Sequence, residues 1–173
     1  MYVYQYSERE RKTMKEFRQL IDADVNVYHE VLLAGYAATK DYPISFDAAD
    51  FTLEESREWV ETYPVYGLFV DGELVSSITL RMPWVRHSTP DVYPHIAHFV
   101  TSPAHKGKGY AREMLAFIEE VLRSVYKTPY VTLGTAAEHP WLPKMYESFG
   151  FKEFDRERFA GKLHTTIFFK KAL

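Results

Sequence analysis

Cysteine is absent from the 173-residue sequence. A disulfide framework and a thiol nucleophile are therefore both excluded. The sequence also has no long run of Lys and Arg, and its formal net charge is −3. A nucleic-acid-binding protein normally carries a basic face, so we expect no nucleic-acid partner.

Long hydrophobic runs are absent too. No segment approaches the about 20 apolar residues that cross a bilayer, and residues 1–12 lack the apolar core of a signal peptide. We therefore expect a cytoplasmic protein with no membrane partner. Internal repeats and linker-like segments are also missing, and the length suits a single domain over residues 1–173.

What is present is the pattern of a mixed α/β domain, with 46% hydrophobic and 26% charged residues. Thr52 and Glu55 have capping-box spacing before an expected helix, and Asp71-Gly72 is typical of a hairpin turn. Helices are predicted over about residues 10–21, 25–38, 53–62, 109–126 and 141–149. In the helix over residues 109–126 the apolar spacing predicts a buried stripe that includes Val125, with Glu119 facing solvent. Strands are predicted over about residues 2–6, 65–70, 74–81, 95–101, 130–135, 151–154 and 163–169. This order predicts a parallel strand pair at the centre and antiparallel flanks.

The glycine-containing turn Lys106–Ala111 lies between an expected strand and an expected helix. Such a turn favours an anion site, because glycine lets the backbone approach a ligand and the first helical N–H groups point at it. A nucleoside-triphosphate loop would need GxxxxGK followed by Ser or Thr, which is missing. The dinucleotide pattern GxGxxG fails because Arg112 replaces its third glycine. The remaining alternative is a turn whose glycines only shape the connection.

Two blocks resemble the GCN5-related N-acetyltransferases (the GNAT family). Lys106-Gly107-Lys108-Gly109-Tyr110-Ala111 resembles that family's acyl-CoA signature, Arg/Gln-x-x-Gly-x-Gly/Ala, with a lysine at the first position as a departure that keeps the charge. Residues 144–151, which include Tyr146 and Gly150, resemble the family's Leu-Tyr-x-x-x-Gly-Phe. The resemblance covers roughly the C-terminal half of the chain.

The resemblance implies a GNAT-like acyl-CoA N-acyltransferase fold, in which the central parallel strands splay apart and acetyl-CoA is the cosubstrate. The pantetheine arm would pair with the strand before the turn, and backbone N–H groups of the turn would hold the pyrophosphate. His139 stands where the family often has an asparagine that contacts the cofactor. The expected cofactor-binding residues are Phe99, Val100, Thr101, Lys106, Gly107, Lys108, Gly109, Tyr110, Ala111, Arg112 and His139. No metal is expected.

For catalysis, the resemblance implies that Tyr146 protonates the leaving thiolate. His95, His98 and Glu138 are candidates for the base that takes a proton from the amine, and the sequence does not choose among them. An ideal strand would put the two histidines on opposite faces, although the family usually has a bulge in this strand. Each of these residues can instead serve packing alone.

The acceptor is expected to be an amine of a small molecule or a peptide. Residues in the regions that form the family's acceptor pocket are Tyr28, His29, Tyr36, Trp84, Arg86, His87 and Phe159. A catalytically silent acyl-CoA-binding module is an alternative function. An enzyme for longer acyl groups or alcohol acceptors is a third hypothesis, and a homodimer is left open.

Overall fold

A computed structural model describes residues 13–86 and 89–173. The strand expected at residues 2–6 and the candidate His87 lie outside these ranges. The described strands form one 7-stranded sheet in the order β1-β2-β3-β4-β5-β7-β6. They are β1 (Lys15–Gln19), β2 (Val65–Val70), β3 (Glu73–Arg81), β4 (His95–Thr101), β5 (Tyr130–Ala136), β6 (Lys152–Glu157) and β7 (Thr166–Ala172).

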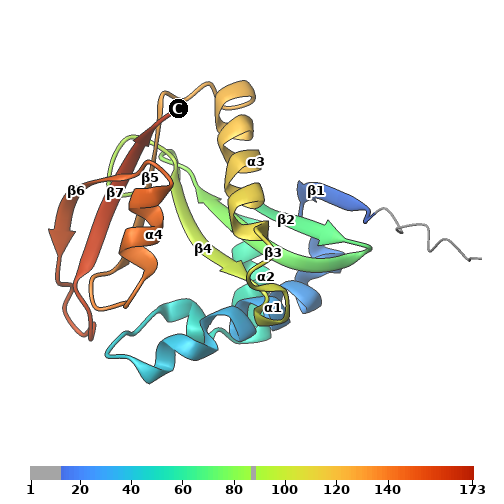
Figure 1. Ribbon diagram of the computed structural model, residues 1–173, viewed down its shortest axis with the longest axis horizontal. Helices are drawn as coiled ribbons and strands as arrows, with labels where there is room; N and C mark the ends of the chain where they lie inside the picture. The colour runs from blue at the N-terminus through green and yellow to red at the C-terminus, as the bar shows by residue number, and fades with distance from the viewer. Residues whose placement is uncertain (1–12, 87–88) are drawn as a thin grey trace, which may run out of the picture.

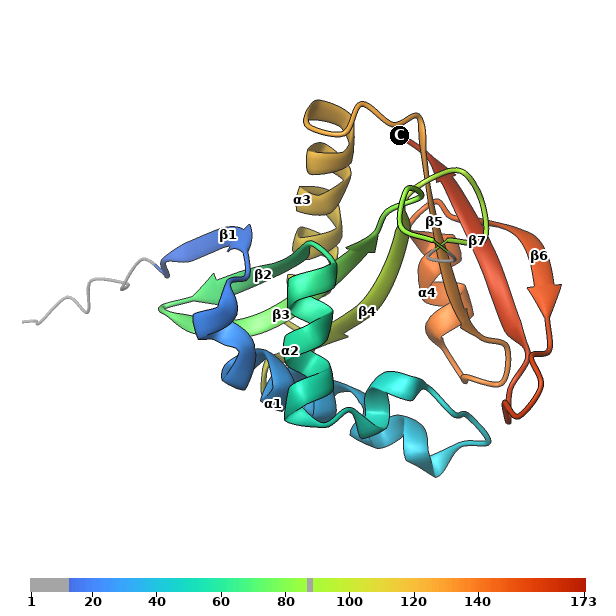
Figure 2. The ribbon, with the colours of Figure 1, turned by 180° about the vertical axis from the view of Figure 1, so that it is seen from behind.

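Helices cover both faces of the sheet (Figures 1 and 2). The α-helices are α1 (Val25–Tyr36), α2 (Leu53–Thr62), α3 (Tyr110–Ser124) and α4 (Leu142–Ser148), with short 3-10 helices η1 (Asp22–Asp24), η2 (Ala37–Asp41), η3 (Asp47–Asp50) and η4 (Pro103–His105). The helices α3 and α4 lie on one face, and α1 and α2 lie on the other. Two hydrophobic clusters follow from this arrangement, the larger one around α3 and the smaller one beneath α1.

The centre of the sheet is where β4 and β5 meet in parallel. They share only two register pairs, His95 with Thr132 and Ile96 with Leu133. Beyond these pairs the strands diverge, which is visible in Figure 2. The predicted mixed α/β fold and its splayed parallel pair are therefore confirmed.

A bulge in β4 also matches the expectation. The register with β3 shifts between the pairs Thr79–Ala97 and Ser77–Val100. His98 lies in this irregular stretch with a φ of +45°, in the left-handed region that residues other than glycine rarely adopt. Because the strand loses strict alternation here, His95 and His98 are not forced onto opposite faces.

Local signals located several elements correctly. The Thr52 hydroxyl accepts from the N–H of Glu55, and the Glu55 carboxylate accepts from the N–H of Thr52 at 2.7 Å. This capping box starts α2 where it was predicted. Asp71 and Gly72 form the turn between β2 and β3, and Gly150 follows α4 with a φ of +91°.

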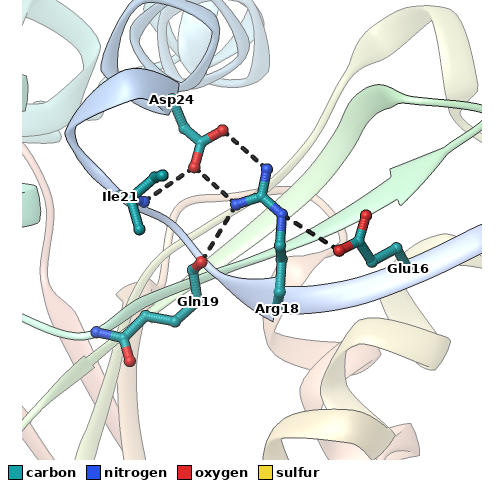
Figure 3. A network of polar contacts seen from close by, with 5 residues as sticks. All are labelled: Glu16, Arg18, Gln19, Ile21 and Asp24. Carbon is teal, nitrogen blue, oxygen red and sulfur yellow. Dashed lines mark hydrogen bonds and ion pairs between the residues drawn. The ribbon is translucent and has the colours of Figure 1, made fainter.

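The helix predicted over residues 10–21 is wrong in its described part. Lys15–Gln19 is instead the edge strand β1, which pairs antiparallel with β2. Arg18 closes the turn after β1 by donating to both carboxylate oxygens of Asp24, at 2.7 and 2.9 Å, as Figure 3 shows. The same carboxylate accepts from the N–H of Ile21 at 2.9 Å. The chain is thus directed from β1 into α1 by one buried carboxylate.

Two residues, one in α3 and one just after it, also depart from the predicted pattern of burial. Val125, expected in the buried stripe, lies just beyond the helix and is exposed. Glu119, expected to face solvent, is buried because its carboxylate pairs with the ammonium of Lys171 on β7. This ion pair joins α3 to the C-terminal strand.

Candidate active site

The turn before α3 is built for close approach by a ligand. Gly107 and Gly109 have φ values of +79° and +80°, so both occupy the left-handed region that glycine tolerates. A Cβ placed at either position would meet no atom within 4 Å, so the space above the backbone is open. Backbone conformation, rather than crowding, explains the glycines.

The first backbone N–H groups of α3, which have no acceptor within the helix, border this open space. The first α-helical hydrogen bond runs from the N–H of Glu113 to the carbonyl of Gly109 at 3.1 Å, so the N–H groups of Tyr110, Ala111 and Arg112 precede it. A cavity of about 320 Å³ lies here, lined by Thr101, Lys106, Gly107, Gly109, Tyr110, Ala111, Arg112, Trp141 and Phe149, among others. Positive side chains, glycines and helix N–H groups together fit the pyrophosphate of coenzyme A.

His139 has a structural task that the sequence did not reveal. Its Nδ1 accepts from the N–H groups of Leu142 at 3.2 Å and Trp141 at 3.4 Å, and so caps the start of α4. Burial, and next to it the charge of Lys106, lower the pKa of His139 and favour the neutral ring that can accept these bonds. The structure thus brings His139 near Lys106, while Nδ1 is already occupied.

A second cavity, of about 300 Å³, opens where β4 and β5 part. Its walls include His95, His98 and Phe99 from β4 and Tyr146 from α4. The structure therefore brings together the predicted acid and both predicted histidines. Because the first cavity lies at the end of β4 and the second along it, the strand links the two.

Tyr146 lies on the buried face of α4, with 6% of its surface exposed. Burial raises the pKa of its phenol, because the charged phenolate would be poorly solvated. The hydroxyl therefore stays protonated at neutral pH. A protonated hydroxyl at the cavity wall can donate a proton to a leaving sulfur.

His95 is oriented by a hydroxyl beneath it. Its Nδ1 lies 2.8 Å from the Oγ1 of Thr132, which itself donates to the carbonyl of Pro94 at 3.4 Å. The Thr132 hydroxyl has one hydrogen; when it donates this hydrogen to Pro94 it accepts from Nδ1–H, and the lone pair of the ring is then on Nε2. Burial, and next to it the charge of Arg81, lower the pKa of His95 to about 3. His95 is therefore a neutral acceptor at physiological pH.

His98 is held mainly by aromatic rings. Its imidazole stacks on Trp59 and meets Phe51 edge-on, with ring centroids 5.2 Å apart. Nδ1 is buried and has no hydrogen-bond partner within the described part of the chain. Burial, and next to it the charge of Arg81, lower the pKa of His98 to about 3 as well.

Glu138 does not line this cavity. Its carboxylate accepts from the N–H of Thr165 at 3.0 and 3.1 Å and so joins the loop after β5 to the start of β7. Of the acceptor candidates, Tyr36 and Phe159 line the cavity. Tyr28 is fully buried in the smaller cluster and Trp84 is 71% exposed.

Sequence reasoning missed the charged residues of the cavity. Arg81 ends β3 and pairs in register with His95, and it also lines the cavity. Asp47 and Lys162 form an ion pair at the same cavity, although they are 115 positions apart. No local pattern marks such residues, because only the folded sheet brings them together.

Comparison with known proteins identifies the family. Residues 32–151 match the sequence model of the acetyltransferase (GNAT) family, which is more than half of the chain. The chain belongs to the GNAT family. Like its relatives it is an N-acetyltransferase, and acetyl-CoA is the cosubstrate that the family uses.

Two curated GNAT relatives come from Bacillus subtilis (strain 168). An S-(2-succino)cysteine N-acetyltransferase is 35% identical over 158 residues, which cover 91% of this chain and 95% of the relative. An S-alkylcysteine N-acetyltransferase is 32% identical over 145 residues, 82% of each chain. These names favour the enzyme over the silent binding module.

Solved structures show the same fold. The PaiA N-acetyltransferase from Thermoplasma acidophilum in complex with coenzyme A has a TM-score of 0.72 at 15% identity, and the match covers 92% of this chain and 99% of that chain. The ribosomal-protein-S18-alanine N-acetyltransferase from Escherichia coli has a TM-score of 0.70 at 15% identity, covering 92% and 94%.

The described residues contain no group of three or more His, Asp or Glu side chains placed to hold a metal ion. None of the helices in residues 13–86 and 89–173 is long and apolar enough to cross a membrane.

Proposed function

We propose that this enzyme acetylates the α-amino group of an S-substituted cysteine, a small-molecule acceptor. The observation that carries the proposal is the position of Arg81, which lines the same cavity as Tyr146 and His95. A guanidinium has five N–H donors, so it can bind a substrate carboxylate while keeping other hydrogen bonds. The names of both Bacillus subtilis relatives support this acceptor class.

An α-amino acid suits this spacing of groups. Its carboxylate and its amine are separated by one carbon atom, so a carboxylate on Arg81 brings the amine close to the register neighbour His95. We assign His95 as the proton acceptor, in the tautomer in which Nδ1–H donates to Thr132 and the lone pair is on Nε2. His98 then serves as a cavity wall held by Trp59 and Phe51.

Acetyl-CoA supplies a thioester, whose acetyl carbon bonds to the amine nitrogen while its carbon–sulfur bond breaks and the thiol departs. The amine must be neutral to attack, and its nitrogen becomes acidic as the new bond forms. Nε2 of His95 accepts the proton from nitrogen at that stage, which a base of low pKa can do. Tyr146 donates its proton to the departing sulfur and recovers one from solvent.

The cofactor contacts follow from the two cavities. We propose that the turn residues 106–112 hold the pyrophosphate and that the backbone of residues 99–101 pairs with the pantetheine arm. The short β4–β5 pairing supports this, because it leaves backbone groups of the diverging strands for another partner. His139 contributes by fixing the start of α4 beside the turn.

The test measures thiol release from acetyl-CoA with S-alkylcysteines, S-(2-succino)cysteine, spermidine and a peptide with a free N-terminal alanine. Acetylation of the cysteine derivatives, and not of the polyamine or the peptide, is the expected result. Arg81→Met should raise KM for a cysteine derivative about 10-fold or more, since a charge-assisted carboxylate contact is lost. Arg57→Met removes an arginine that pairs with Asp22 on the outer surface and should leave KM unchanged. Preference for spermidine or the peptide would overturn the proposal.

Four further expectations accompany this function. We propose a cytoplasmic enzyme, one domain over residues 1–173, no nucleic-acid partner, and either a monomer or a homodimer. The formal net charge of −3 supports the absence of a nucleic-acid partner. Cell fractionation and light scattering of the purified protein test the location and the oligomeric state.

A further inference from the structure

We propose that the acceptor cavity selects S-substituted cysteines whose sulfur substituent is uncharged, and that Asp47 sets this selectivity by neutralising Lys162. The inference rests on the proposed function and narrows its substrate class. It concerns the end of the cavity formed by η3 and the hairpin between β6 and β7.

The ionised side chains that line the described cavity are Asp47, Arg81 and Lys162. Asp47 accepts from the Lys162 ammonium, which also donates to the carbonyl of Ser45 at 3.3 Å. His95, His98 and His164 also line the cavity and stay neutral at pH 7, because burial lowers the pKa of all three rings. The lining therefore carries one more positive charge than negative charge.

S-alkylcysteines and S-(2-succino)cysteine differ in the number of negative charges that they bring into the cavity. An S-alkylcysteine with a neutral amine carries one carboxylate, which the Arg81 guanidinium can balance. S-(2-succino)cysteine carries two additional carboxylates on its sulfur substituent. Moving them from water into the aromatic part of the cavity without a matching cation is unfavourable. The Asp47 side chain is 78% exposed at the mouth of the cavity, so its carboxylate adds a repulsion that solvent partly screens.

Aromatic rings form much of the remaining wall of this region, beside the smaller side chains of Ser45, Ala48 and Thr166. Phe46 meets Tyr36 at 5.5 Å and His164 at 5.1 Å between ring centroids. Phe159 meets Phe168 edge-on at 6.3 Å. An apolar substituent gains hydrophobic contact with these rings, whereas a carboxylate finds few hydrogen-bond donors among them.

Lys162 is placed independently of Asp47. The N–H of the next residue, Leu163, donates to the Oγ of Ser45 at 3.0 Å, and the N–H of Ser45 donates to Nδ1 of His164 at 3.2 Å. These bonds join the segment before η3 to the β6–β7 hairpin. Removing the Asp47 charge should therefore release the Lys162 charge without separating the two walls.

The experiment compares kcat/KM for S-butylcysteine and S-(2-succino)cysteine, whose sulfur substituents have equal numbers of carbon atoms. Wild type should favour S-butylcysteine by at least about 10-fold, the cost of burying an unmatched polar group. Asp47→Asn should reduce this ratio by up to about fivefold, because Lys162 then binds a substituent carboxylate in a partly exposed ion pair. The double variant Asp47→Asn/Lys162→Met should restore the wild-type ratio, because it also lacks the Lys162 ammonium that would bind the substituent carboxylate.

Asp50→Asn is the matched control. Asp50 lies on the same 3-10 helix, and it pairs with Lys40 at 2.7 Å rather than with a cavity residue. Its substitution should leave the ratio unchanged. A wild-type preference for S-(2-succino)cysteine, or an unchanged ratio in Asp47→Asn, would overturn the inference while leaving the proposed function in place. Failure to acetylate either compound would overturn both.

Discussion

The imidazole of His98 stacks on the indole of Trp59, with ring centroids 4.0 Å apart and ring planes inclined by 21°. Trp59 is itself fixed, because its Nε1–H donates to the Oγ1 of Thr79 on β3 at 2.9 Å. An aromatic surround of this kind excludes water and disfavours the imidazolium ion. The folded protein therefore holds His98 neutral at a pH where an exposed histidine is charged.

Neutral burial of His98 predicts a loss of stability in mild acid. Its pKa is lowered from 6.5 to about 3. Between pH 6.5 and pH 3, therefore, the imidazole of His98 is protonated in the unfolded chain and neutral in the folded chain. The unfolding free energy should fall as pH decreases from 6.5, by about 1.4 kcal/mol per pH unit for this group. His98→Asn, which tolerates the left-handed backbone, should reduce the slope by that amount. Urea unfolding at a series of pH values measures it, and an unchanged slope would contradict the prediction.

Substitution of Gly109 separates backbone strain from cofactor binding. Gly109→Ala should cost about 1–2 kcal/mol of stability, because its φ of +80° is unfavourable for alanine. The same change at Gly72, with a φ of +85° in the β2–β3 turn, should cost a similar amount. Coenzyme A should raise the melting temperature of Gly72→Ala as in wild type and of Gly109→Ala much less. Equal shifts in the two variants would place the pyrophosphate elsewhere.

Removal of the Tyr146 hydroxyl should affect turnover more than folding. Tyr146→Phe keeps the ring that packs against Phe151 and Phe169, so the melting temperature should change little. Loss of the proton donor should lower kcat by about 10²-fold or more. Thiol release from acetyl-CoA measures this rate. Tyr66→Phe removes another buried hydroxyl, outside the two cavities, and should leave kcat within about twofold of wild type. A Tyr146→Phe enzyme with wild-type kcat would exclude the proposed acid.

The Arg18–Asp24 pair should stabilise the start of α1 in a pH-dependent way. The hydrogen bonds from Arg18 are the main cause of the lowered pKa of Asp24, with help from the N–H of Ile21. Asp24→Asn should cost about 1–3 kcal/mol at pH 7. This difference should shrink as pH falls below 3.8 toward the lowered folded pKa, where wild type also loses the charge.

Asp22→Asn is the control for that prediction. Its carboxylate is 71% exposed and pairs with Arg57 on the surface. An exposed pair contributes at most about 1 kcal/mol, so the substitution should have a small effect. Chemical denaturation at pH 7 and pH 3 measures both variants. An Asp24→Asn effect that is equally large at both values would show that packing, rather than charge, is responsible.

Elements with local signals could be predicted from the sequence. Thr52 and Glu55 cap each other within one turn, so the start of α2 needs no distant contact. The Lys106–Ala111 turn was found because backbone conformation demands glycine at fixed positions. The prediction for β1 was wrong for the opposite reason. Its apolar spacing fits a helix, and only the antiparallel register with β2, about 50 residues later, makes it a strand.

Prediction of the cavity residues was also restricted to those marked by a local sequence pattern. His95 and Tyr146 were predicted because a family pattern and a strand position marked them. Arg81, Asp47 and Lys162 have no such mark, since the ion pair and the register neighbour exist only after β3, η3 and the β6–β7 hairpin have assembled. Glu119 was misplaced likewise, because its partner Lys171 lies 52 positions away.

The two register pairs between β4 and β5 have a mechanical consequence. They are the narrowest hydrogen-bonded connection in the sheet, between a half made of β1–β4 and a half made of β5–β7. A pantetheine arm that is hydrogen-bonded between the diverging parts of β4 and β5 would couple the two halves of the sheet. We expect amide exchange in β4 and β5 to slow together when coenzyme A binds, so that cofactor concentration determines whether the sheet opens as two cooperative units or as one.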